Sequence, residues 1–196
     1  MVDIYLVGVG GQGIITASKI IGSAAMLAGE NVVLSETHGM AQRGGSVVCT
    51  ARIGDSSNPL IRDSGADIIL SLELLETARA ICKANEDTVF VASTDMIIPL
   101  SVSTQNLEYP SFEDIKRRVE AVSRAAVFID SQKVAEEEGV PMSSNVVMIG
   151  ALAGTGTTGI DEDLFKEAVG LNIRRNSSEN RKAFARGVEA GRIALS

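Results

Sequence analysis

Residues 2–28, VDIYLVGVGGQGIITASKIIGSAAMLA, contain the unit that decides the fold. Residues 2–7 form a short, mostly apolar run with β-branched side chains, a pattern typical of a buried strand. The glycine-rich stretch 8–13 follows, and residues 14–28 then have the composition of an apolar helix. This order predicts a strand, a glycine turn and a helix in direct succession.

The glycine turn has the spacing of a phosphate-binding loop. Gly8, Gly10 and Gly13 satisfy G-x-G-x-x-G between the predicted strand and the predicted helix. Free N–H groups and the positive end of the helix dipole attract phosphate there, and glycines permit its close approach. Gly11 and Gln12 add flexibility and a donor side chain, so all five residues are expected to bind a ligand. The alternative is a tight turn whose glycines serve only helix–strand packing.

The rest of the chain alternates between strand and helix patterns. This alternation favours a parallel sheet covered on both faces. We therefore predict an α/β, Rossmann-like three-layer fold, with a mostly parallel sheet and a helical C-terminal tail, in a single domain spanning residues 1–196. The further predicted strands are 31–35, 46–53, 66–72, 88–92 and 126–130, with a short extended piece at 97–102; the further helices are 73–84, 111–124, 131–138, 145–153, 161–169 and 178–195.

Composition excludes several classes of function. The net charge of −7 and the lack of a basic arm argue against nucleic acid or an anionic membrane as the partner. Cys49 and Cys82 form no CxxC pair, so they cannot hold an iron–sulfur cluster or structural zinc alone. Asp3 stands where a signal peptide would be basic, and the first helix is too short for a membrane span. We expect a cytoplasmic protein.

The first helix and the C-terminal tail both suggest a partner. Lys19 is the only charged residue between Asp3 and Glu30, so the helix has apolar side chains beyond the face that packs on the sheet. Those side chains must be buried against another element or subunit. A second subunit is favoured for that cover over the C-terminal helices. The basic residues of the tail indicate a solvated face, or else a docking surface that Gly187 and Gly191 would let approach closely.

The loop that follows the second predicted strand carries further candidates. Glu36 lies just over 20 residues beyond the glycine turn, where an acid grips a ribose hydroxyl in dinucleotide sites. Arg43, beside Gln42, offers a planar donor fork to a carboxylate or phosphate. His38, the only histidine, can transfer a proton or bond a substrate oxygen. His38 and Arg43 are the catalytic candidates. Taken singly, each residue favours a structural role instead, with Arg43 paired to a local acid and His38 capping a loop.

Two motifs together resemble a known family. GVGGQG at 8–13, followed by ETHGMAQRGGSV at 36–47, is similar to the small (beta) subunit of indolepyruvate ferredoxin oxidoreductase and to the gamma subunits of other 2-oxoacid:ferredoxin oxidoreductases. The similarity spans nearly the whole chain. Further matching residues are Ala66, Asp67, Glu73, Glu76, Arg79, Asn145, Gly150, Ala151, Leu152, Asn180, Ala183, Phe184 and Gly187.

The resemblance implies a subunit that supports coenzyme-A-dependent oxidative decarboxylation of an arylpyruvate, with electrons passed to ferredoxin. In that family thiamine diphosphate, Mg²⁺ and 4Fe–4S clusters reside on the larger partner subunit, so this chain is expected to bind none of them firmly. The glycine turn, Gln12, Gln42 and Arg43 are then expected to form an anion slot, with the coenzyme A pyrophosphate as a candidate ligand.

Two other readings stay open at this point. A stand-alone NAD-dependent dehydrogenase is supported by the glycine turn and Glu36. Hydride transfer also needs a pocket that orients the substrate, and a single histidine is weak evidence for one. A non-enzymatic interaction module is the second alternative, with glycines that only pack.

Overall fold

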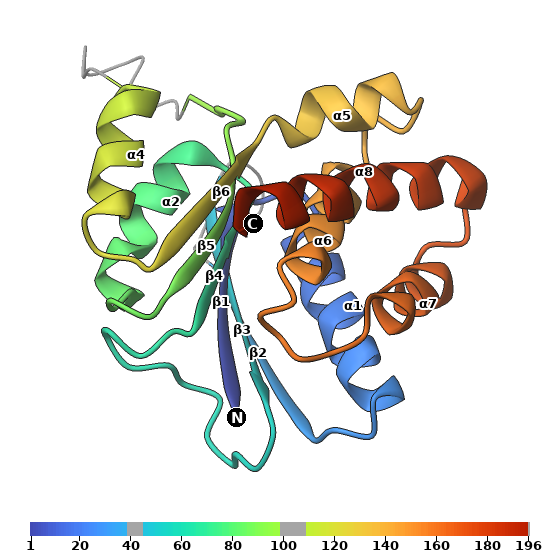
Figure 1. Cartoon of the computed structure of the whole chain (residues 1–196), viewed down its shortest axis with the longest axis horizontal. Coiled ribbons are helices and arrows are strands. Elements are labelled where there is room, and N and C mark those ends of the chain that lie inside the picture. Colours follow the sequence, from blue (N-terminus) through green and yellow to red (C-terminus); the bar gives the residue numbers. More distant parts are fainter. Residues whose placement is uncertain (39–44, 99–108, 196) are drawn as a thin grey trace.

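The computed structural model describes residues 1–38, 45–98 and 109–195. In this part of the chain a six-stranded sheet, ordered β2-β3-β1-β4-β5-β6, lies between two layers of helices (Figure 1). The strands are β1 (Val2–Val9), β2 (Val32–His38), β3 (Ser46–Ile53), β4 (Ile68–Ser71), β5 (Val89–Ser93) and β6 (Ala125–Ile129). The helices are α1 (Ile14–Leu27), α2 (Leu74–Ala80) with a 3₁₀ turn at Ile81–Lys83, α4 (Phe112–Glu120), α5 (Ser131–Glu137), α6 (Ser144–Gly154), α7 (Glu162–Asn172) and α8 (Ser177–Leu195).

The sheet is mixed but largely parallel. Strands β1, β4, β5 and β6 run parallel, whereas β3 is antiparallel to both of its neighbours, β1 and β2. The predicted three-layer α/β fold with a mostly parallel sheet and C-terminal helices is therefore confirmed. Helix α1 carries the chain from β1 past the position of β3 to the edge strand β2.

Alternating side chains of the central strands build one hydrophobic cluster on each face. Ile68 and Leu70 of β4 belong to the cluster beneath α1, α6, α7 and α8. Ile69, between them, belongs to the cluster beneath α2 and α4. Successive strand residues point to opposite faces, so an unbroken apolar run is what a strand buried on both sides requires.

Helix α1 is covered by helices of its own chain. Its buried side chains join the cluster that contains Phe165 and Ala168 of α7 and most of α6. The preference for a second subunit as its cover was wrong. The apolar residues of α1 show that most of its surface must be buried. They do not show which element packs against that surface.

Glycines on α6 and α8 allow these two helices to pack closely. A Cβ atom at Gly187 would lie 2.0 Å from the Val147 carbonyl oxygen, and one at Gly150 would lie 2.1 Å from the Phe184 carbonyl oxygen. Gly154 and Gly191 are equally crowded by backbone. Gly187 and Gly191 therefore serve a contact within the chain, which corrects their suggested use against a partner.

Most predicted elements are present with shifted ends. Strand β1 extends to Val9 and β2 to His38, because both form long ladders with β3, from Val2 opposite Ile53 to Val9 opposite Ser46 on the β1 side. Ser111 caps α4 as predicted, since its hydroxyl oxygen accepts from the Asp114 amide. Residues 97 and 98 form no strand, and the rest of the predicted piece 97–102 lies outside the described residues.

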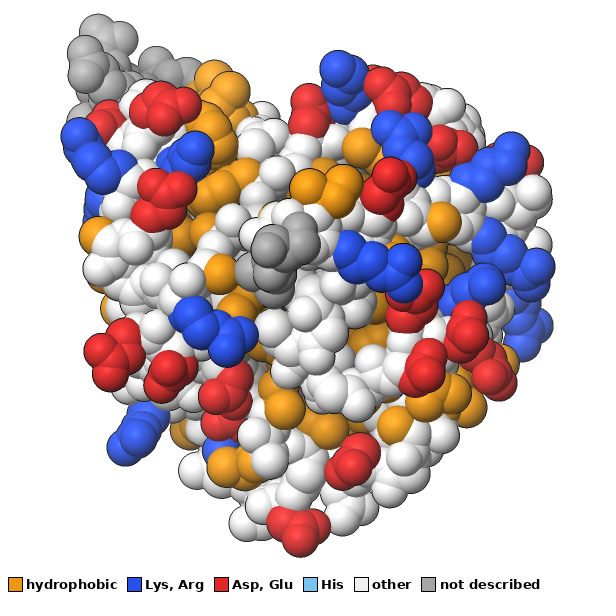
Figure 2. Space-filling view, viewed as in Figure 1, with side chains coloured by type: hydrophobic (Ala, Val, Ile, Leu, Met, Phe, Trp, Pro, Cys, Tyr) orange, Lys and Arg blue, Asp and Glu red, His pale blue; other side chains and the backbone are white. Residues whose placement is uncertain are grey.

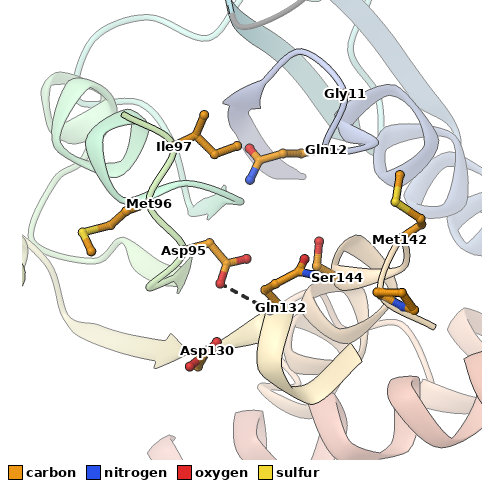
Figure 3. A pocket seen from close by; sticks show the side chains of 10 residues that line it. Gly11, Gln12, Asp95, Met96, Ile97, Asp130, Gln132, Met142 and Ser144 are labelled. Atoms are coloured by element: carbon orange, nitrogen blue, oxygen red, sulfur yellow. Dashed lines mark hydrogen bonds between the residues drawn. The ribbon is translucent and has the colours of Figure 1, made fainter. Parts of the chain in front are cut away.

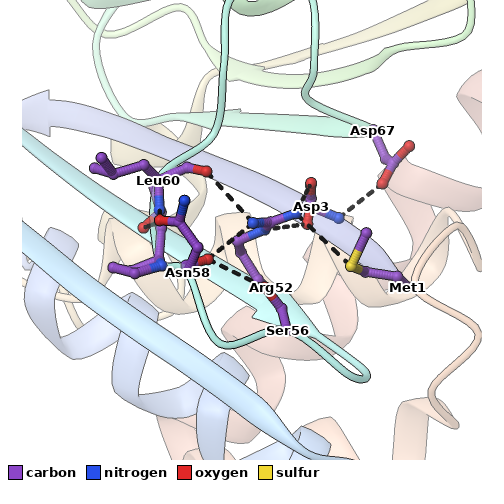
Figure 4. A network of polar contacts seen from close by, with 9 residues as sticks. Met1, Asp3, Arg52, Ser56, Asn58, Leu60 and Asp67 are labelled. Carbon is purple, nitrogen blue, oxygen red and sulfur yellow. Dashed lines mark hydrogen bonds and ion pairs between the residues drawn. The ribbon is translucent and has the colours of Figure 1, made fainter.

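A polar network closes the amino edge of the sheet (Figure 4). Arg52 of β3 forms an ion pair with Asp3 of β1 at 2.8 Å and donates to the Asn58 carbonyl. The Asp3 amide in turn donates to Asp67. The network ties the long β3–β4 connection to β1, at the edge opposite the glycine turn.

Candidate functional site

The glycine turn lies at the carboxyl edge of the sheet, between β1 and α1. Gly11 and Gly13 have φ values of +109° and +79°, which residues with a Cβ atom rarely adopt. A Cβ at Gly13 would also lie 2.6 Å from Nδ2 of Asn145, at the start of α6. The Asn145 amide donates to the Gly13 carbonyl, so two helix N-termini, those of α1 and α6, meet at this turn.

The Gln12 side chain braces the turn. Its Oε1 accepts from the Val9 amide at 2.8 Å, and its Nε2 donates to the Leu72 carbonyl at 2.7 Å. These bonds tie the end of β1 to the end of β4. One Nε2 hydrogen is left beyond the bond to Leu72, so Gln12 retains a donor while holding the turn in shape.

A cavity of about 300 Å³ lies against the first turn of α1. We call it the amide cavity; it is lined by Val9, Gly10, Gly11, Gly13, Ile14, Ile15, Thr16 and Val47. Helix α1 has no side-chain cap, and its first backbone bond runs from the Ala17 amide to Gly13. The amides of the preceding helical residues therefore lack intrahelical acceptors, which is the arrangement that binds anions.

The described end of the second candidate loop, at Gly45, contacts the glycine turn. The Gly10 amide donates to the Gly45 carbonyl at 2.8 Å. His38 ends β2, with its backbone paired to Val47 beside the amide cavity. Gln42 and Arg43 lie outside the described residues. The Gly45 end of the loop thus adjoins the turn, whereas the backbone of His38 is separated from β1 by the width of β3.

Glu36 lies away from the turn. It sits within β2, two residues before the end of that strand, and is opposite Cys49 of β3, which is opposite Leu6 of β1. Two strand spacings, about 9–10 Å, therefore separate its backbone from β1. In dinucleotide-binding folds the second strand neighbours the first. The antiparallel β3 takes that place here, which disfavours the dehydrogenase alternative.

A second cavity, of about 470 Å³, opens on the other side of the turn (Figure 3). We call it the aspartate cavity. It lies between the ends of β1, β5 and β6 and the start of α6. Its lining residues are Gly11, Gln12, Asp95, Met96, Ile97, Asp130, Gln132, Pro141, Met142 and Ser144.

Asp95 is held in a fixed position in the aspartate cavity. Its carboxylate accepts from the Ser131 hydroxyl at 2.9 Å and from the Gln132 amide at 3.3 Å. Burial raises the pKa of Asp95, and the bond from Ser131 opposes that rise. No sequence motif had singled out Asp95. The only local feature of the sequence that could have indicated Asp95 is its position just after a buried strand. The glycine turn has the same position relative to β1.

Two buried glutamates hold the segments that surround the site. Glu73, with a side chain 1% exposed, accepts from the Ile97 amide, the Glu76 amide and the Tyr109 hydroxyl. Glu76 accepts from the Ser46 hydroxyl at 2.6 Å and pairs with Arg79. Burial and the bond to Glu73 raise the pKa of Tyr109, so its hydroxyl stays protonated at neutral pH. The N-terminus of α2 thus fixes β3 and one wall of the aspartate cavity.

Exposed apolar side chains form the rim of the aspartate cavity. Met142 is 85% exposed, and Met96, Ile97 and Ile98 are also exposed. In the space-filling view the molecule is hollowed between α4 and α5, and hydrophobic side chains line that hollow (Figure 2). Exposed apolar groups that gather around a cavity are typical of a contact surface.

Metal and membrane sites are not evident in the described ranges. Residues 1–38, 45–98 and 109–195 contain no group of three or more His, Cys, Asp or Glu side chains able to hold a metal. Burial raises the pKa of the Cys49 thiol to about 11, whereas Cys82 is exposed. No helix in these ranges is long and apolar enough to cross a lipid bilayer.

The sheet, the uncapped helix start and the two cavities at the carboxyl edge define a Rossmann-like α/β fold with a candidate ligand site at its glycine turn. The model of the pyruvate ferredoxin/flavodoxin oxidoreductase family matches residues 3–190. The chain belongs to this family.

Individual relatives agree with the family match. The chain is 44% identical to the indolepyruvate oxidoreductase subunit IorB of Archaeoglobus fulgidus, over 78% of this chain and 76% of that protein. It is 38% identical to IorB of Pyrococcus horikoshii, over 98% and 97% of the two chains. The resemblance to the indolepyruvate oxidoreductase small subunit is thus confirmed.

A solved structure shows the same fold. The keto/oxoacid ferredoxin oxidoreductase gamma subunit of Geobacter sulfurreducens superposes with a TM-score of 0.72 at 22% identity, over 99% of this chain and 100% of that chain. A 2-oxoglutarate:ferredoxin oxidoreductase from Magnetococcus marinus, solved with 2-oxoglutarate, coenzyme A and succinyl-CoA bound, gives 0.71 at 23% identity, over 98% of this chain and 31% of that chain.

Proposed function

We propose that the chain is the small subunit of an indolepyruvate-type 2-oxoacid:ferredoxin oxidoreductase and completes the coenzyme A site of its larger partner. The observation that carries this proposal is the amide cavity. An uncapped helix start, glycines at positive φ and the end of a second glycine-rich loop meet there, and no acidic side chain is among the described lining residues.

This chain's residues would bind and orient a phosphate group. The free amides at the start of α1 supply directed donors, and the helix dipole adds a favourable field. Arg43 and Gln42, in the loop that ends at Gly45, are proposed as the side-chain donors of the slot, and His38 is kept as a candidate proton carrier. Family members that act on 2-oxoacids use thiamine diphosphate and iron–sulfur clusters, and the partner is proposed to hold both.

Co-expression with the larger subunit tests the assembly. The complex should be brown and should reduce ferredoxin with indolepyruvate and coenzyme A, whereas this chain alone should be colourless and inactive. Failure of the two chains to co-purify would overturn the subunit assignment and favour an independent function.

The coenzyme A site is tested by Arg43→Ala in the complex. The variant should need more coenzyme A for half-maximal activity, with single-turnover decarboxylation in its absence unchanged. Arg174→Ala, at an exposed arginine on the α7–α8 turn, is the matched control and should alter neither quantity. If Arg43→Ala lowers both activities equally, the residue does not act on coenzyme A.

A further inference from the structure

The two cavities that flank the glycine turn differ in their chemistry. Both are lined by Gly11, where a Cβ atom would meet nothing within 4 Å, so the space beside this residue is open. The described lining of the amide cavity carries no charge. The described lining of the aspartate cavity carries two carboxylates, Asp95 and Asp130, and neither lysine nor arginine. A single ligand that spans the turn would present a different group to each side.

Asp95 has acceptor capacity left for a ligand. A carboxylate offers about four acceptor positions; the Ser131 hydroxyl and the Gln132 amide occupy two of them, and the neighbouring Ser93 hydroxyl also interacts with the carboxylate, which leaves at least one position. Figure 3 shows its carboxylate directed to the cavity that it shares with Gln12. Asp130 is exposed and caps α5 by accepting from the Lys133 amide at 3.0 Å, whereas Asp95 is partly buried in the cavity wall. Asp95 is therefore the acidic group best placed to receive a donor.

The other walls restrict the ligand further. Met96, Ile97, Pro141 and Met142 provide apolar surface, and the volume of about 470 Å³ is that of a small-molecule site. Without a cation among these walls, a phosphate would be repelled by the carboxylates. The cavity instead suits an uncharged group that combines apolar atoms with hydroxyl or amide donors.

We propose that the aspartate cavity binds the uncharged arm of a pantetheine-type acyl carrier, with Asp95 accepting a hydrogen bond from its hydroxyl or amide groups. The phosphate end of the same carrier then lies across Gly11 in the amide cavity. This inference rests on the proposed function. It adds that the uncharged arm binds on one side of the glycine turn and the phosphate end on the other.

Titration of the full chain with pantetheine, followed by amide NMR shifts, tests the assignment. In the wild-type chain the amides of Gln132 and Ser144 should shift with pantetheine and not with inorganic phosphate. Asp95→Asn should weaken pantetheine binding by roughly tenfold or more, because it removes a charged acceptor. Asp87→Asn, at an exposed aspartate in the turn before β5, is the matched control and should bind normally.

The control ligands separate this inference from the proposed function. Inorganic phosphate should shift the amides of residues 14–16 equally in the wild type and in Asp95→Asn, which also shows that the variant is folded. The absence of pantetheine-induced shifts at Gln132 and Ser144, equal pantetheine binding by Asp95→Asn, or displacement of pantetheine by adenosine from these residues would overturn the inference. Those outcomes leave the Arg43 test of the complex unaffected.

Discussion

Gly13 and Gly29 have almost the same backbone conformation in different surroundings. Their φ values are +79° and +77°. A Cβ at Gly13 would press on the Asn145 side chain, whereas one at Gly29 would meet nothing within 4 Å. Alanine at Gly29 would therefore have only the energetic cost of a left-handed backbone conformation. Alanine at Gly13 would have that cost and also the cost of crowding Asn145, where α1 meets α6.

We expect Gly29→Ala to lower the free energy of unfolding by about 1–2 kcal/mol, the cost of placing alanine in the left-handed region. Gly13→Ala should lose a further 1–3 kcal/mol or so, because it also displaces Asn145 from the turn. Urea unfolding of both variants measures the difference. Equal losses would show that the contact with Asn145 contributes nothing to stability.

At the scale of elements, the glycines of α6 and α8 set the distance between these helices. Gly187→Ala should lower the free energy of unfolding by about 3 kcal/mol or more, since its methyl group would meet the Val147 carbonyl of the α6 backbone. Gly170→Ala, at an exposed position of α7 with open space around it, is the control. It should be neutral or stabilise by up to about 1 kcal/mol. Thermal unfolding of the two variants provides the comparison, and similar transition temperatures would contradict the close packing.

The hydrogen bonds at the start of α2 provide a second test at the scale of elements. Tyr109→Phe removes the hydroxyl that donates to Glu73 and accepts from the Leu75 amide. We expect a loss of about 1–3 kcal/mol in the free energy of unfolding, because buried partners are left unpaired. Tyr5→Phe should cost less than about 0.5 kcal/mol, since the Tyr5 hydroxyl has no hydrogen bond among the described residues. Denaturant titration distinguishes the two, and an equal effect would show that the Glu73 network is not stabilising.

At the scale of the whole molecule, the exposed apolar side chains at the carboxyl edge make it the candidate contact surface for the proposed partner. Met142→Asp should prevent co-purification with the larger subunit while leaving thermal stability unchanged, because Met142 is 85% exposed on the cavity rim. Leu60→Asp places the same charge at a 70% exposed position of the opposite edge and should still assemble. Assembly of the Met142 variant, or failure of the Leu60 variant, would locate the interface elsewhere.

The local features of the chain were predictable from sequence. The strand–glycine turn–helix unit and the Ser111 cap follow from periodicity and from residue types at fixed spacing, because they depend on neighbours within one or two turns. Segment ends were less predictable. The end of β2 at His38 depends on pairing with β3, and the predicted end at residue 35 took no account of that partner.

The sequence by itself determined the α/β class, the glycine turn and the family, because apolar periodicity, glycine spacing and a long motif are properties of contiguous residues. Only the tertiary structure decided that β3 separates Glu36 from the turn, that Gln12 braces two strands and that Gly187 packs on α6. It also brought Asp95 to the glycine turn, more than 80 residues away in the chain. The physical reason is that strand order and helix packing minimise the apolar surface exposed by the whole chain. That total depends on contacts between distant segments, so it cannot be read from any one stretch of sequence.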